Sequence, residues 1–370
     1  MVSLNVLTNT WNTSVVPIDT NDTIDTNDNP SRVLEIGGEY LSYSARKIFF
    51  LINHVIVDMC ICVFGIVGNF LNIKVFLKQG LRTSVNLSLC AMSLSDLVGL
   101  VFQVWHNFCM NPYLELAGLP VDFLKIQILT AGCPNVAMTR ITGWITMYIT
   151  AERCLSVLLP LRIRQLVTVK RTAVVLVLCY GINLAFYLPL YAGNYLSWRF
   201  YPNLNKTMLG VSSWGNADVV DLVMNVSHFY LSVIAFICVV IFTVVLVVSL
   251  KRKSRWRRSA TSDRDQNEAL SSRENKTVGM VIMVAVVLIV CYAPGVTISF
   301  VEVFYPDFGI SAKQENAYHV IWSFCFVFHS VNASINVIVY YRMSSKYRNT
   351  LQEIFPVFKS KAKLDDQSGN

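Results

Sequence analysis

Apolar residues are concentrated in seven long segments of the chain, and shorter polar stretches separate them. A helix rises about 1.5 Å per residue, so about 20 mostly apolar residues cross the hydrocarbon core of a bilayer. Backbone groups in lipid must find partners within the segment, and the short alternating segments of a membrane β-barrel are absent. The pattern therefore predicts an all-α membrane protein, a bundle of seven transmembrane helices. The expected helices span 48–76, 84–107, 123–157, 172–193, 227–250, 277–305 and 316–341.

Composition and charge agree with a membrane protein. Hydrophobic residues make up 54% of the 370 residues and charged residues only 15%, whereas about a quarter of a soluble domain is charged. Most Lys and Arg residues fall in segments that share one side of the membrane with the C-terminus, and the positive-inside rule makes that side cytoplasmic. The net charge of +8 then reflects topology and contact with anionic lipid, and not a nucleic-acid partner. We expect a multi-pass protein of the plasma membrane with an extracellular N-terminus.

The two ends of the chain are polar. Residues 1–45 are rich in Asn, Thr, Asp and Ser, which predicts a disordered extracellular tail. We expect a membrane domain over 46–356 and a cytoplasmic tail over 357–370. The pattern N-x-S/T, the acceptor for N-linked glycans, occurs on the expected outer side at Asn12, Asn21, Asn205 and Asn225.

Polar residues inside the apolar segments fall in five short motifs. These are GNFLN with Asn69, SLSD with Asp96, ERC at Glu152–Cys154, CYAPG at Cys291–Gly295 and NVIVY at Asn336–Tyr340. In their order and placement the motifs resemble those of the rhodopsin-like (class A) G-protein-coupled receptors. The sequence around ERC is most similar to that of invertebrate peptide and chemosensory receptors. The resemblance covers about 48–356 and implies that 46–356 is a receptor domain.

A short amphipathic segment follows the seventh span. Met343, Tyr347, Leu351 and Phe355 repeat every four residues among basic residues, and Pro356 ends the pattern. The period predicts a helix that lies on the inner leaflet and contacts membrane lipid. It resembles the eighth helix of class A receptors.

The resemblance implies a switch at the cytoplasmic end of the bundle. Arg153 would pair with Glu152 and Glu274 in the resting receptor, and Tyr340 would belong to the same switch. Glu274 lies twenty residues before Pro294, about 30 Å along a helix, which places it opposite Arg153. On activation the sixth span would swing outward, and Arg153 would face a heterotrimeric G protein. The alternative is a solvated cluster of interfacial charges.

The resemblance also implies a hydrated polar core. Its members would be Asn69, Asp96, Thr142, Asn332 and Asn336. In the family this cluster often holds a sodium ion, although Ala333 stands where a sodium-binding serine is frequent. Sodium is the one cofactor that the sequence suggests, and no motif predicts a metal site of another kind. Polar residues that only join helices are the alternative reading.

The sequence departs from the family pattern at two places that affect the site. Tyr292 replaces the usual tryptophan, and its hydroxyl needs a partner. Residues 193–225 contain no cysteine, so the disulfide that commonly links this loop to the third span cannot form. A bond between Cys109 and Cys133 could substitute for it, and two separate thiols are the alternative.

Arg140 is the most informative candidate for a ligand contact. It lies thirteen residues before Arg153, about 20 Å along the helix, at a depth where arginine needs a cavity or a partner. Either it is a counter-ion for an anionic ligand, or it bonds to Asp58 or to backbone carbonyls. The other candidates for the pocket lining are Asn135, Tyr187, Tyr292, Glu302, Trp322 and His329.

Together these features predict a receptor that binds an extracellular ligand and activates a heterotrimeric G protein. Asn135 stands where amine receptors typically carry aspartate, and 316–341 has no lysine to hold retinal. Tryptophan, tyrosine and arginine in the loop 193–225 favour a peptide ligand such as a neuropeptide. A small chemosensory molecule is the alternative ligand, and a transporter or channel is the alternative class. No nucleophile elbow, P-loop or zinc motif occurs, so we do not expect an enzyme.

Overall fold

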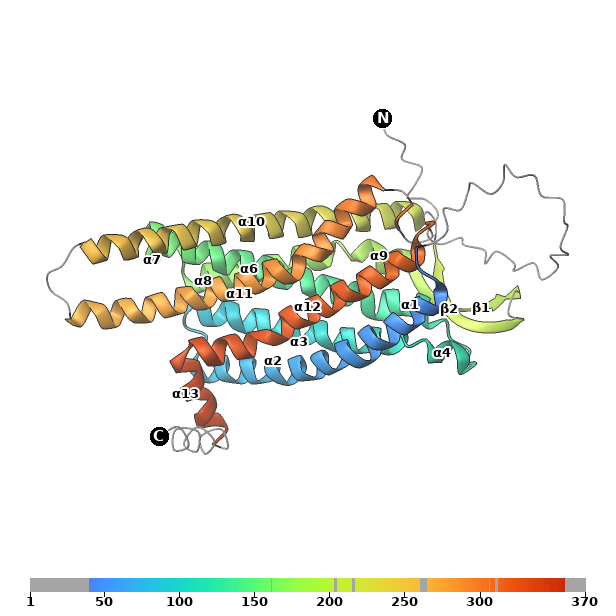
Figure 1. Ribbon diagram of the computed structural model, residues 1–370, viewed down its shortest axis with the longest axis horizontal. Coiled ribbons are helices and arrows are strands. Elements are labelled where there is room, and N and C mark those ends of the chain that lie inside the picture. Colours follow the sequence, from blue (N-terminus) through green and yellow to red (C-terminus); the bar gives the residue numbers. More distant parts are fainter. Residues whose placement is uncertain are drawn as a thin grey trace.

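The computed structural model describes residues 40–160, 162–202, 205–214, 217–259, 265–305, 307–309 and 312–356. Within these ranges the side chains of 115–116, 164, 217–225, 253–276 and 303 are left out of the description. The described helices form an elongated bundle (Figure 1). Helix α13 (Ser345–Ile354) lies at one end, and a hairpin of β1 (Asn194–Tyr201) and β2 (Lys206–Ser213) lies at the other. We call these ends the α13 end and the hairpin end.

The first long helix is built from three continuous parts. α1 (Tyr43–Phe50) begins after Ser42, whose hydroxyl caps its first turn. A π-helical stretch, η3 (Leu51–Asp58), follows, and α2 (Met59–Gln79) completes the helix. Gly80 ends it with a φ of +84°, a conformation that glycine adopts without strain. The helix therefore begins earlier than the predicted start at residue 48.

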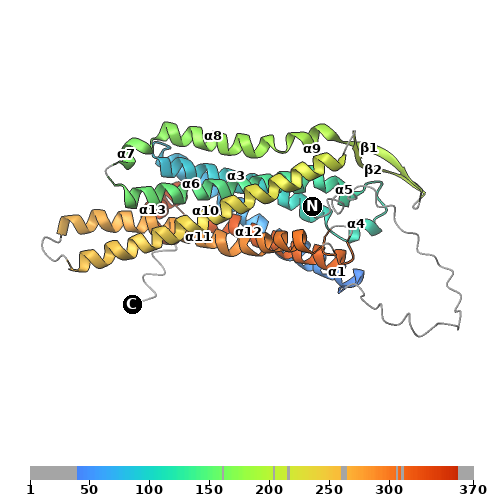
Figure 2. The same cartoon turned by 90° about the horizontal axis from the view of Figure 1, so that it is seen from above.

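Further long helices complete the described bundle. They are α3 (Ser84–Cys109), the run of α5 (Phe123–Gln127), η4 (Ile128–Gly132) and α6 (Cys133–Leu158), the pair α8 (Val169–Ala185) and α9 (Leu188–Gly193), α10 (Ala217–Ser259), α11 (Asp265–Phe304) and α12 (Glu315–Met343). The short helices α4 (Tyr113–Leu116) and α7 (Ile163–Leu166) lie in the connections. α10 and α11 continue beyond their neighbours at the α13 end (Figure 2). Both are longer than the predicted spans 227–250 and 277–305.

Six of the described helical stretches are long and apolar enough to cross a membrane, judged by length and composition. The stretch that contains α6 is not among them, and it carries polar side chains such as Asn135, Arg140 and Glu152. α6 contacts α3, α8, α10 and α11, so protein and not lipid surrounds these side chains. With α6 as the central seventh helix, the predicted all-α membrane bundle is confirmed.

The largest apolar cluster of the core includes the predicted eighth helix. Buried residues from six long helices take part, among them Phe76, Met92, Ile145, Leu176, Val284 and Tyr340. Tyr347 and Leu351 of α13 are buried against this cluster. The hydroxyl of Tyr347 also donates a hydrogen bond to Oδ1 of Asn72 at 2.6 Å. The amphipathic period after the seventh span thus predicted α13 correctly.

The hairpin was not predicted. β1 and β2 pair antiparallel from Asn194 opposite Ser213 to Tyr201 opposite Lys206. The first strand reads NYLSWRFY, and its aromatic residues suit a strand. β2 also touches the segment before α5, because Leu209 forms a parallel bridge with Val121. The hairpin end of the third span is therefore tied to the loop between the fourth and fifth spans.

α2 and α12 approach each other closely at Gly65. A Cβ atom there would lie 2.0 Å from Oγ of Ser334 and 2.6 Å from Cδ1 of Leu100. Only glycine leaves room for this contact. The close approach brings the backbone of α12 within reach of Asn69, one turn further along α2.

Candidate functional site

The centre of the predicted polar core is Asp96. Its Oδ1 accepts a hydrogen bond from the hydroxyl of Thr142 at 2.6 Å, and its Oδ2 accepts one from Nδ2 of Asn336 at 2.9 Å. The hydroxyls of Thr142 and Ser95 lie 2.9 Å apart. Asp96 is only 3% exposed, and a buried carboxylate needs such partners. The site joins α3, α6 and α12 at one point.

The other two predicted core residues lie around this centre in different ways. Asn69 donates hydrogen bonds from Nδ2 to the carbonyls of Ala333 at 2.7 Å and Gly65 at 3.0 Å. It therefore fastens α2 to α12. Asn332 is buried and lines, together with Asp96, a cavity with an empty volume of about 290 Å³.

The predicted pair of Glu152 and Arg153 is present on α6. Nη2 of Arg153 lies 2.5 Å from Oε1 of Glu152. Oε2 of Glu152 accepts a hydrogen bond from the hydroxyl of Ser84 at 2.7 Å, and that hydroxyl lies 2.8 Å from Oγ1 of Thr172. Glu152 is 4% exposed. Its carboxylate thus connects α6 to the first turns of α3 and α8, a linkage that sequence reasoning missed.

The remaining two residues of the predicted switch have different outcomes. Glu274 lies on α11, and its side chain falls outside the described residues, so its pairing with Arg153 stays a prediction. Tyr340 is fully buried, and its ring packs on those of Phe76 and Tyr347 with centroid distances of 5.4 and 5.7 Å. Its hydroxyl has no hydrogen-bond partner among the described residues.

Four of the seven predicted pocket residues line one cavity between α6, α10, α11 and α12. They are Arg140, Tyr292, Trp322 and His329. The cavity has an empty volume of about 600 Å³, and we call it the central cavity. Its lining from α10 was not predicted and comprises His228, Phe229, Ser232 and Val233. Nδ1 of His228 is buried without a hydrogen-bond partner among the described residues.

The other three predicted pocket residues lie elsewhere. Asn135 lines the small cavity beside Asp96 and donates a hydrogen bond from Nδ2 to the carbonyl of Gly99 at 2.9 Å. Tyr187 packs beneath Arg140 and does not line the central cavity. Glu302 accepts a hydrogen bond from the hydroxyl of Tyr318 at 2.8 Å, which ties α11 to α12.

Arg140 is held by neutral partners. Its Nε donates to Oδ1 of Asn183 at 2.7 Å, and its Nη2 donates to the backbone carbonyl of the same residue at 2.9 Å. The guanidinium carbon lies 5.0 Å from the centre of the Tyr187 ring. No carboxylate lies within ion-pair distance of Arg140 among the described side chains. The charge is therefore positioned but not neutralised.

Asp58, the proposed internal partner of Arg140, belongs to a separate polar cluster. Its Oδ2 accepts hydrogen bonds from Nε2 of Gln103 and Nδ2 of Asn107, each at 2.8 Å. The alternative in which Asp58 neutralises Arg140 is therefore wrong. Asp58 lies on η3 and Arg140 on α6. The side-chain amides of Gln103 and Asn107, both on α3, already donate to the carboxylate of Asp58.

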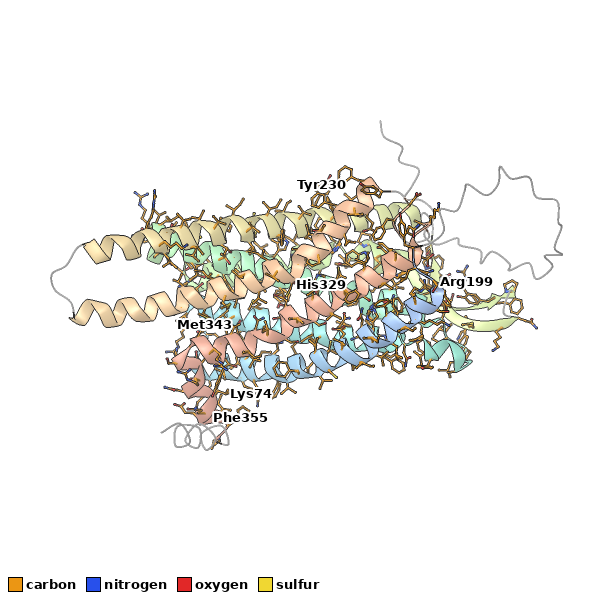
Figure 3. The ribbon with its side chains drawn as sticks, viewed as in Figure 1. Lys74, Arg199, Tyr230, His329, Met343 and Phe355 are labelled. Carbon is orange, nitrogen blue, oxygen red and sulfur yellow. The ribbon has the colours of Figure 1, made fainter. Side chains whose placement is uncertain are left out.

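Tyr292 separates the central cavity from the small cavity beside Asp96. It lines both, as do Thr139 and His329. The hydroxyl of Tyr292 donates to the carbonyl of Thr139 at 2.9 Å, which supplies the partner that the sequence analysis required. Its ring meets that of His329 edge to face, with centroids 4.9 Å apart. His329 lies midway along the bundle (Figure 3), and the two cavities therefore share a wall at this level.

The proposed bond between Cys109 and Cys133 is not present. All ten cysteines lie in the described part of the chain, and none forms a disulfide. Cys109 lines a cavity that faces α1, whereas Cys133 packs with Leu129 and Tyr187 near α9. The two side chains therefore have different neighbours.

The four proposed glycosylation sites fall in different places. Asn205 is exposed in the hairpin turn, with a φ of +47°. Asn225 lies within α10, directly before its apolar stretch, and its side chain falls outside the described residues. Asn12 and Asn21 lie outside the described residues, as does most of the tail predicted over 1–45 and all of the tail predicted over 357–370.

Contacts other than a disulfide fasten the hairpin to the third span. The amide of Leu209 donates to the carbonyl of Pro120, and the amide of Asp122 donates to the carbonyl of Leu209, each at 2.9 Å. The hydroxyl of Tyr201 donates to Oδ2 of Asp122 at 3.1 Å. Nζ of Lys125 lies 3.8 Å from the same carboxylate oxygen. Backbone pairing thus performs the linking role that the missing cysteine cannot.

Tyr201→Phe is expected to loosen the hairpin. Losing a hydrogen bond to a partly exposed carboxylate costs about 1 kcal/mol, so the amides of Leu209 and Asp122 should exchange hydrogen about fivefold faster. Hydrogen–deuterium exchange with mass spectrometry would measure this. The matched control is Tyr195→Phe, because Tyr195 on the same strand packs its ring on Trp214. Equal exchange in wild type and Tyr201→Phe would contradict the anchoring role.

The effect of pH on this contact follows from the pKa of Tyr201. Burial and the neighbouring Asp122 carboxylate raise that pKa. The stabilisation is fully present below about pH 10, the usual tyrosine pKa. It is lost only as pH rises through the higher pKa of the folded state. The hairpin anchor should therefore be insensitive to pH across the neutral range.

Comparisons with known proteins agree with this arrangement. A family model described as "Serpentine type 7TM GPCR chemoreceptor Srw" matches residues 56–358. The neuromedin-U receptor 2 of Homo sapiens is 25% identical over 338 residues, which cover 86% of this chain and 76% of the relative. The thyrotropin-releasing hormone receptor of Homo sapiens is 24% identical over 332 residues, with 81% and 77% covered. A putative G-protein coupled receptor of Caenorhabditis elegans is 22% identical over 316 residues, with 78% and 69% covered.

These matches confirm the resemblance that the five motifs indicated. The matched range contains Asp96, the pair of Glu152 and Arg153, and the central cavity. It favours a receptor over the alternative of a transporter or channel. The chain therefore belongs to the Srw family of serpentine seven-transmembrane G-protein-coupled chemoreceptors.

Proposed function

We propose that the chain binds an extracellular peptide in the central cavity and activates a heterotrimeric G protein at the α13 end. The observation that supports this most strongly is the wall of Tyr292, Thr139 and His329. It is shared by the central cavity, where Arg140 lies, and by the small cavity beside Asp96. A ligand that moves this wall would alter the contacts of Asp96 with α6 and α12. Binding would thereby shift the population between two arrangements of the helices.

The G-protein contact would form where Arg153 lies. Arg153 is paired with Glu152, its neighbour in the chain, and the second carboxylate oxygen of Glu152 is already bonded to Ser84. An outward movement of α11 would leave Arg153 available to a partner while Glu152 keeps its bond to α3. At this end of the bundle Arg153 would then exchange its contact with Glu152 for one with the G protein.

A peptide is favoured as ligand by two observations. Relatives of this chain are named for neuromedin-U, thyrotropin-releasing hormone and galanin, which are peptides. Two aromatic side chains of the hairpin, Trp198 and Phe200, are exposed at the hairpin end of the bundle. A small chemosensory molecule is the second candidate, because the matching family is described as one of chemoreceptors.

The hairpin end would face the cell exterior, and the C-terminus would be cytoplasmic. Asn205 in the hairpin turn is exposed and would be accessible to the glycosylation machinery there. Many large apolar side chains on the outside of the helices are exposed, among them Val67, Phe70, Val177 and Ile241. In the plasma membrane these would contact lipid.

The residues around Asp96 fit a sodium ion. The small cavity is lined by a carboxylate, the hydroxyls of Ser95 and Thr142, and the amide of Asn332. Hard cations prefer such oxygen ligands. Asp96 and Thr142 would hold the ion, which would supply positive charge beside the carboxylate. The place of Ala333, whose carbonyl is bonded to Asn69, offers no side-chain oxygen.

The experiment that tests the function is nucleotide exchange with purified components. The full chain in lipid nanodiscs would be mixed with G proteins of different subtypes and screened against a library of peptides and metabolites. We expect at least one peptide to raise the exchange rate. Ligand-dependent ion conduction or solute uptake without any G protein would instead support the transporter or channel class.

Arg140→Gln is expected to weaken the response to a peptide with a carboxylate. Truncating one partner of a buried charge pair costs about 2 kcal/mol or more, so the half-maximal concentration should rise at least thirtyfold. The bonds to Asn183 can be made by glutamine in part, which limits the effect on folding. When the carboxylates of the same peptide are amidated, its half-maximal concentration should be equal for the wild type and the variant. If the substitution raised the half-maximal concentration equally for both peptides, Arg140 would support the fold of the receptor and would not bind the carboxylate.

A further inference from the structure

Part of the backbone of β1 points away from the hairpin. β1 and β2 form a two-stranded sheet at the hairpin end (Figure 1). Its register continues to Gly193 opposite Trp214, where the amide of Trp214 donates to the carbonyl of Gly193 at 2.8 Å. Opposite residues of an antiparallel pair alternate between a bonded pair and a pair whose backbone groups point outward. The N–H and C=O groups of Leu196, Trp198 and Phe200 therefore point outward, along what we call the outer edge of β1.

The bonds of β2 agree with this alternation. Leu209, which lies opposite Trp198, directs its N–H to the carbonyl of Pro120 and its C=O to the amide of Asp122. The outer edge of β2 thus has a neighbouring segment. In the part of the chain that the structure describes, no segment forms a bridge or a backbone hydrogen bond with the outer edge of β1.

The outer edge of β1 lacks the features that usually protect an exposed strand. Proteins guard such edges with lysine, proline, bulges or short strands. β1 is eight residues long, reads NYLSWRFY and contains neither lysine nor proline. The side chains of Leu196, Trp198 and Phe200 are 43%, 62% and 59% exposed. Outward backbone groups and large exposed apolar side chains thus belong to the same three residues, which favours a partner strand at this edge.

We propose that the outer edge of β1 binds an extended segment of the peptide ligand, which adds a third strand to the sheet. This assignment rests on the proposed receptor function. Alternating N–H and C=O groups along an edge are complementary to another extended backbone, and main-chain hydrogen bonds supply much of the affinity in strand addition. Ligand residues opposite Leu196, Trp198 and Phe200 would be apolar or aromatic, because side chains of opposite residues share one face of a sheet.

A peptide suits this edge better than a second copy of the chain. Stable protein–protein interfaces bury about 1,200 Å² or more in total. A large aromatic side chain buries about 150–250 Å² when it is fully covered, so three partly exposed side chains on one strand fall short of that area. A peptide that also reaches the central cavity needs only a weak second contact, because its first contact raises the effective concentration of its remainder at the edge.

The test uses a fluorescent octapeptide of alternating tyrosine and threonine, and the full chain in nanodiscs that hold one receptor each. Fluorescence polarisation would measure binding, and hydrogen–deuterium exchange would be resolved at single residues. We expect saturable binding that slows exchange at the amides of Leu196, Trp198 and Phe200. The amides of Ser197 and Arg199 face β2 in the register, and their exchange should change little.

Trp198→Pro tests the role of the backbone. Proline removes the outward N–H and obstructs an added strand, and a strand tolerates it where the N–H faces away from its partner. We expect the octapeptide to bind at least about tenfold more weakly. The matched control is Trp198→Val, which also removes the indole ring but keeps the N–H in a strand-forming residue, so its affinity should fall much less. Slow exchange at the amides of Leu209 and Asp122 would show that the hairpin is intact in both variants.

Methylation of the peptide backbone gives a second test that leaves the receptor unchanged. One isomer of the octapeptide would be N-methylated on its tyrosines and the other on its threonines. The N–H groups of successive residues in a strand point to opposite sides, so only one of the two sets faces β1. We expect one isomer to lose affinity at least about tenfold and the other to bind as the parent peptide does.

Several results would overturn the assignment. They are absence of octapeptide binding, equal binding of the two methylated isomers, and equal affinity of Trp198→Pro and Trp198→Val with the hairpin intact. Slow exchange at the outer edge before any peptide is added would also overturn it. Acceleration after removal of residues 1–39 would then assign the edge to the N-terminal segment, and slow exchange confined to nanodiscs with two receptors would assign it to a second copy.

Nucleotide exchange in the same nanodiscs keeps the two proposals apart. A library peptide that stimulates exchange equally in the wild type and in Trp198→Pro would reject the edge and retain the receptor function. Conversely, an octapeptide that slows exchange at the outer edge of a chain that no library peptide stimulates would retain the edge as a site for extended peptides and reject the receptor function.

Discussion

Arg153→Ala is expected to abolish ligand-stimulated nucleotide exchange while the receptor still reaches the cell surface at nearly its normal level. The described ion pair of Arg153 is with Glu152, the preceding residue on the same helix. Its removal therefore breaks no described contact between helices, and Ser84 still bonds to Glu152. Folding should survive, whereas the cation that we assign to the G protein is lost. Exchange assays with surface labelling of the same cells would measure both quantities.

The control for this variant is Glu152→Gln. Glutamine keeps the size of the side chain and an oxygen for the hydroxyl of Ser84, but it no longer holds Arg153 by charge. We expect a higher basal rate of exchange without ligand, because the resting arrangement loses an ion pair. Unaltered exchange in Arg153→Ala would reject the switch. A fall of surface level and exchange by the same factor would show instead that Arg153 is needed for folding.

Asp96→Asn is expected to lower the maximal ligand response about tenfold with a much smaller effect on surface level. Asparagine presents one oxygen to the two donors of this site, Thr142 and Asn336, and its amide group must face the other. The hydroxyl of Thr142 can accept from that amide, so the helices remain joined. One weakened hydrogen bond to a charged group corresponds to about 1.5 kcal/mol, which is about tenfold. Exchange assays normalised to surface receptor would measure it.

The reciprocal double variant distinguishes a local effect from a general one. Asp96→Asn combined with Asn336→Asp keeps one carboxylate and one amide in contact but exchanges their helices. We expect it to recover part of the response, because the pair bond between α3 and α12 is restored. A double variant as impaired as the sum of its single variants would indicate that the two side chains act independently.

The helices were predictable because each has its own signal in the chain. The apolar segments gave seven helices, and the four-residue period of Tyr347 and Leu351 gave α13. The predicted ends of the helices were less accurate, because polar helical turns such as 265–276 extend a helix beyond its apolar stretch. The π-helical stretch η3 has no such signal, since LINHVIVD differs little from the sequence of an α-helix.

The hydrogen-bond partners of the polar residues were less predictable than the position of these residues across the membrane. Counting along the helix placed Arg140 within the membrane, but the choice of Asn183 over Asp58 depends on how α6 and α8 are rotated. Asn183 was visible as a polar residue in an apolar segment. Ser84 and Thr172 gave less signal, because hydroxyl residues are common where helices begin. Their meeting at Glu152 follows from the tertiary packing.

The hairpin shows a different limit of the sequence. The sequence analysis predicts a loop over 193–225, although the strand formers of this segment and the turn at Asn205 are compatible with two strands. The second strand also pairs with the neighbouring segment, where Leu209 forms a bridge with Val121. A search for cysteines could not find this link, because it is made by backbone amides and carbonyls.

That link has a consequence for the conditions in which the receptor works. The attachment of the hairpin contains no sulfur atom, since it consists of peptide hydrogen bonds and the phenol of Tyr201. Thiol reductants and oxidants have no bond to act on there. The hairpin should therefore stay attached to the bundle in strongly reducing media. Purification with dithiothreitol should leave ligand recognition intact.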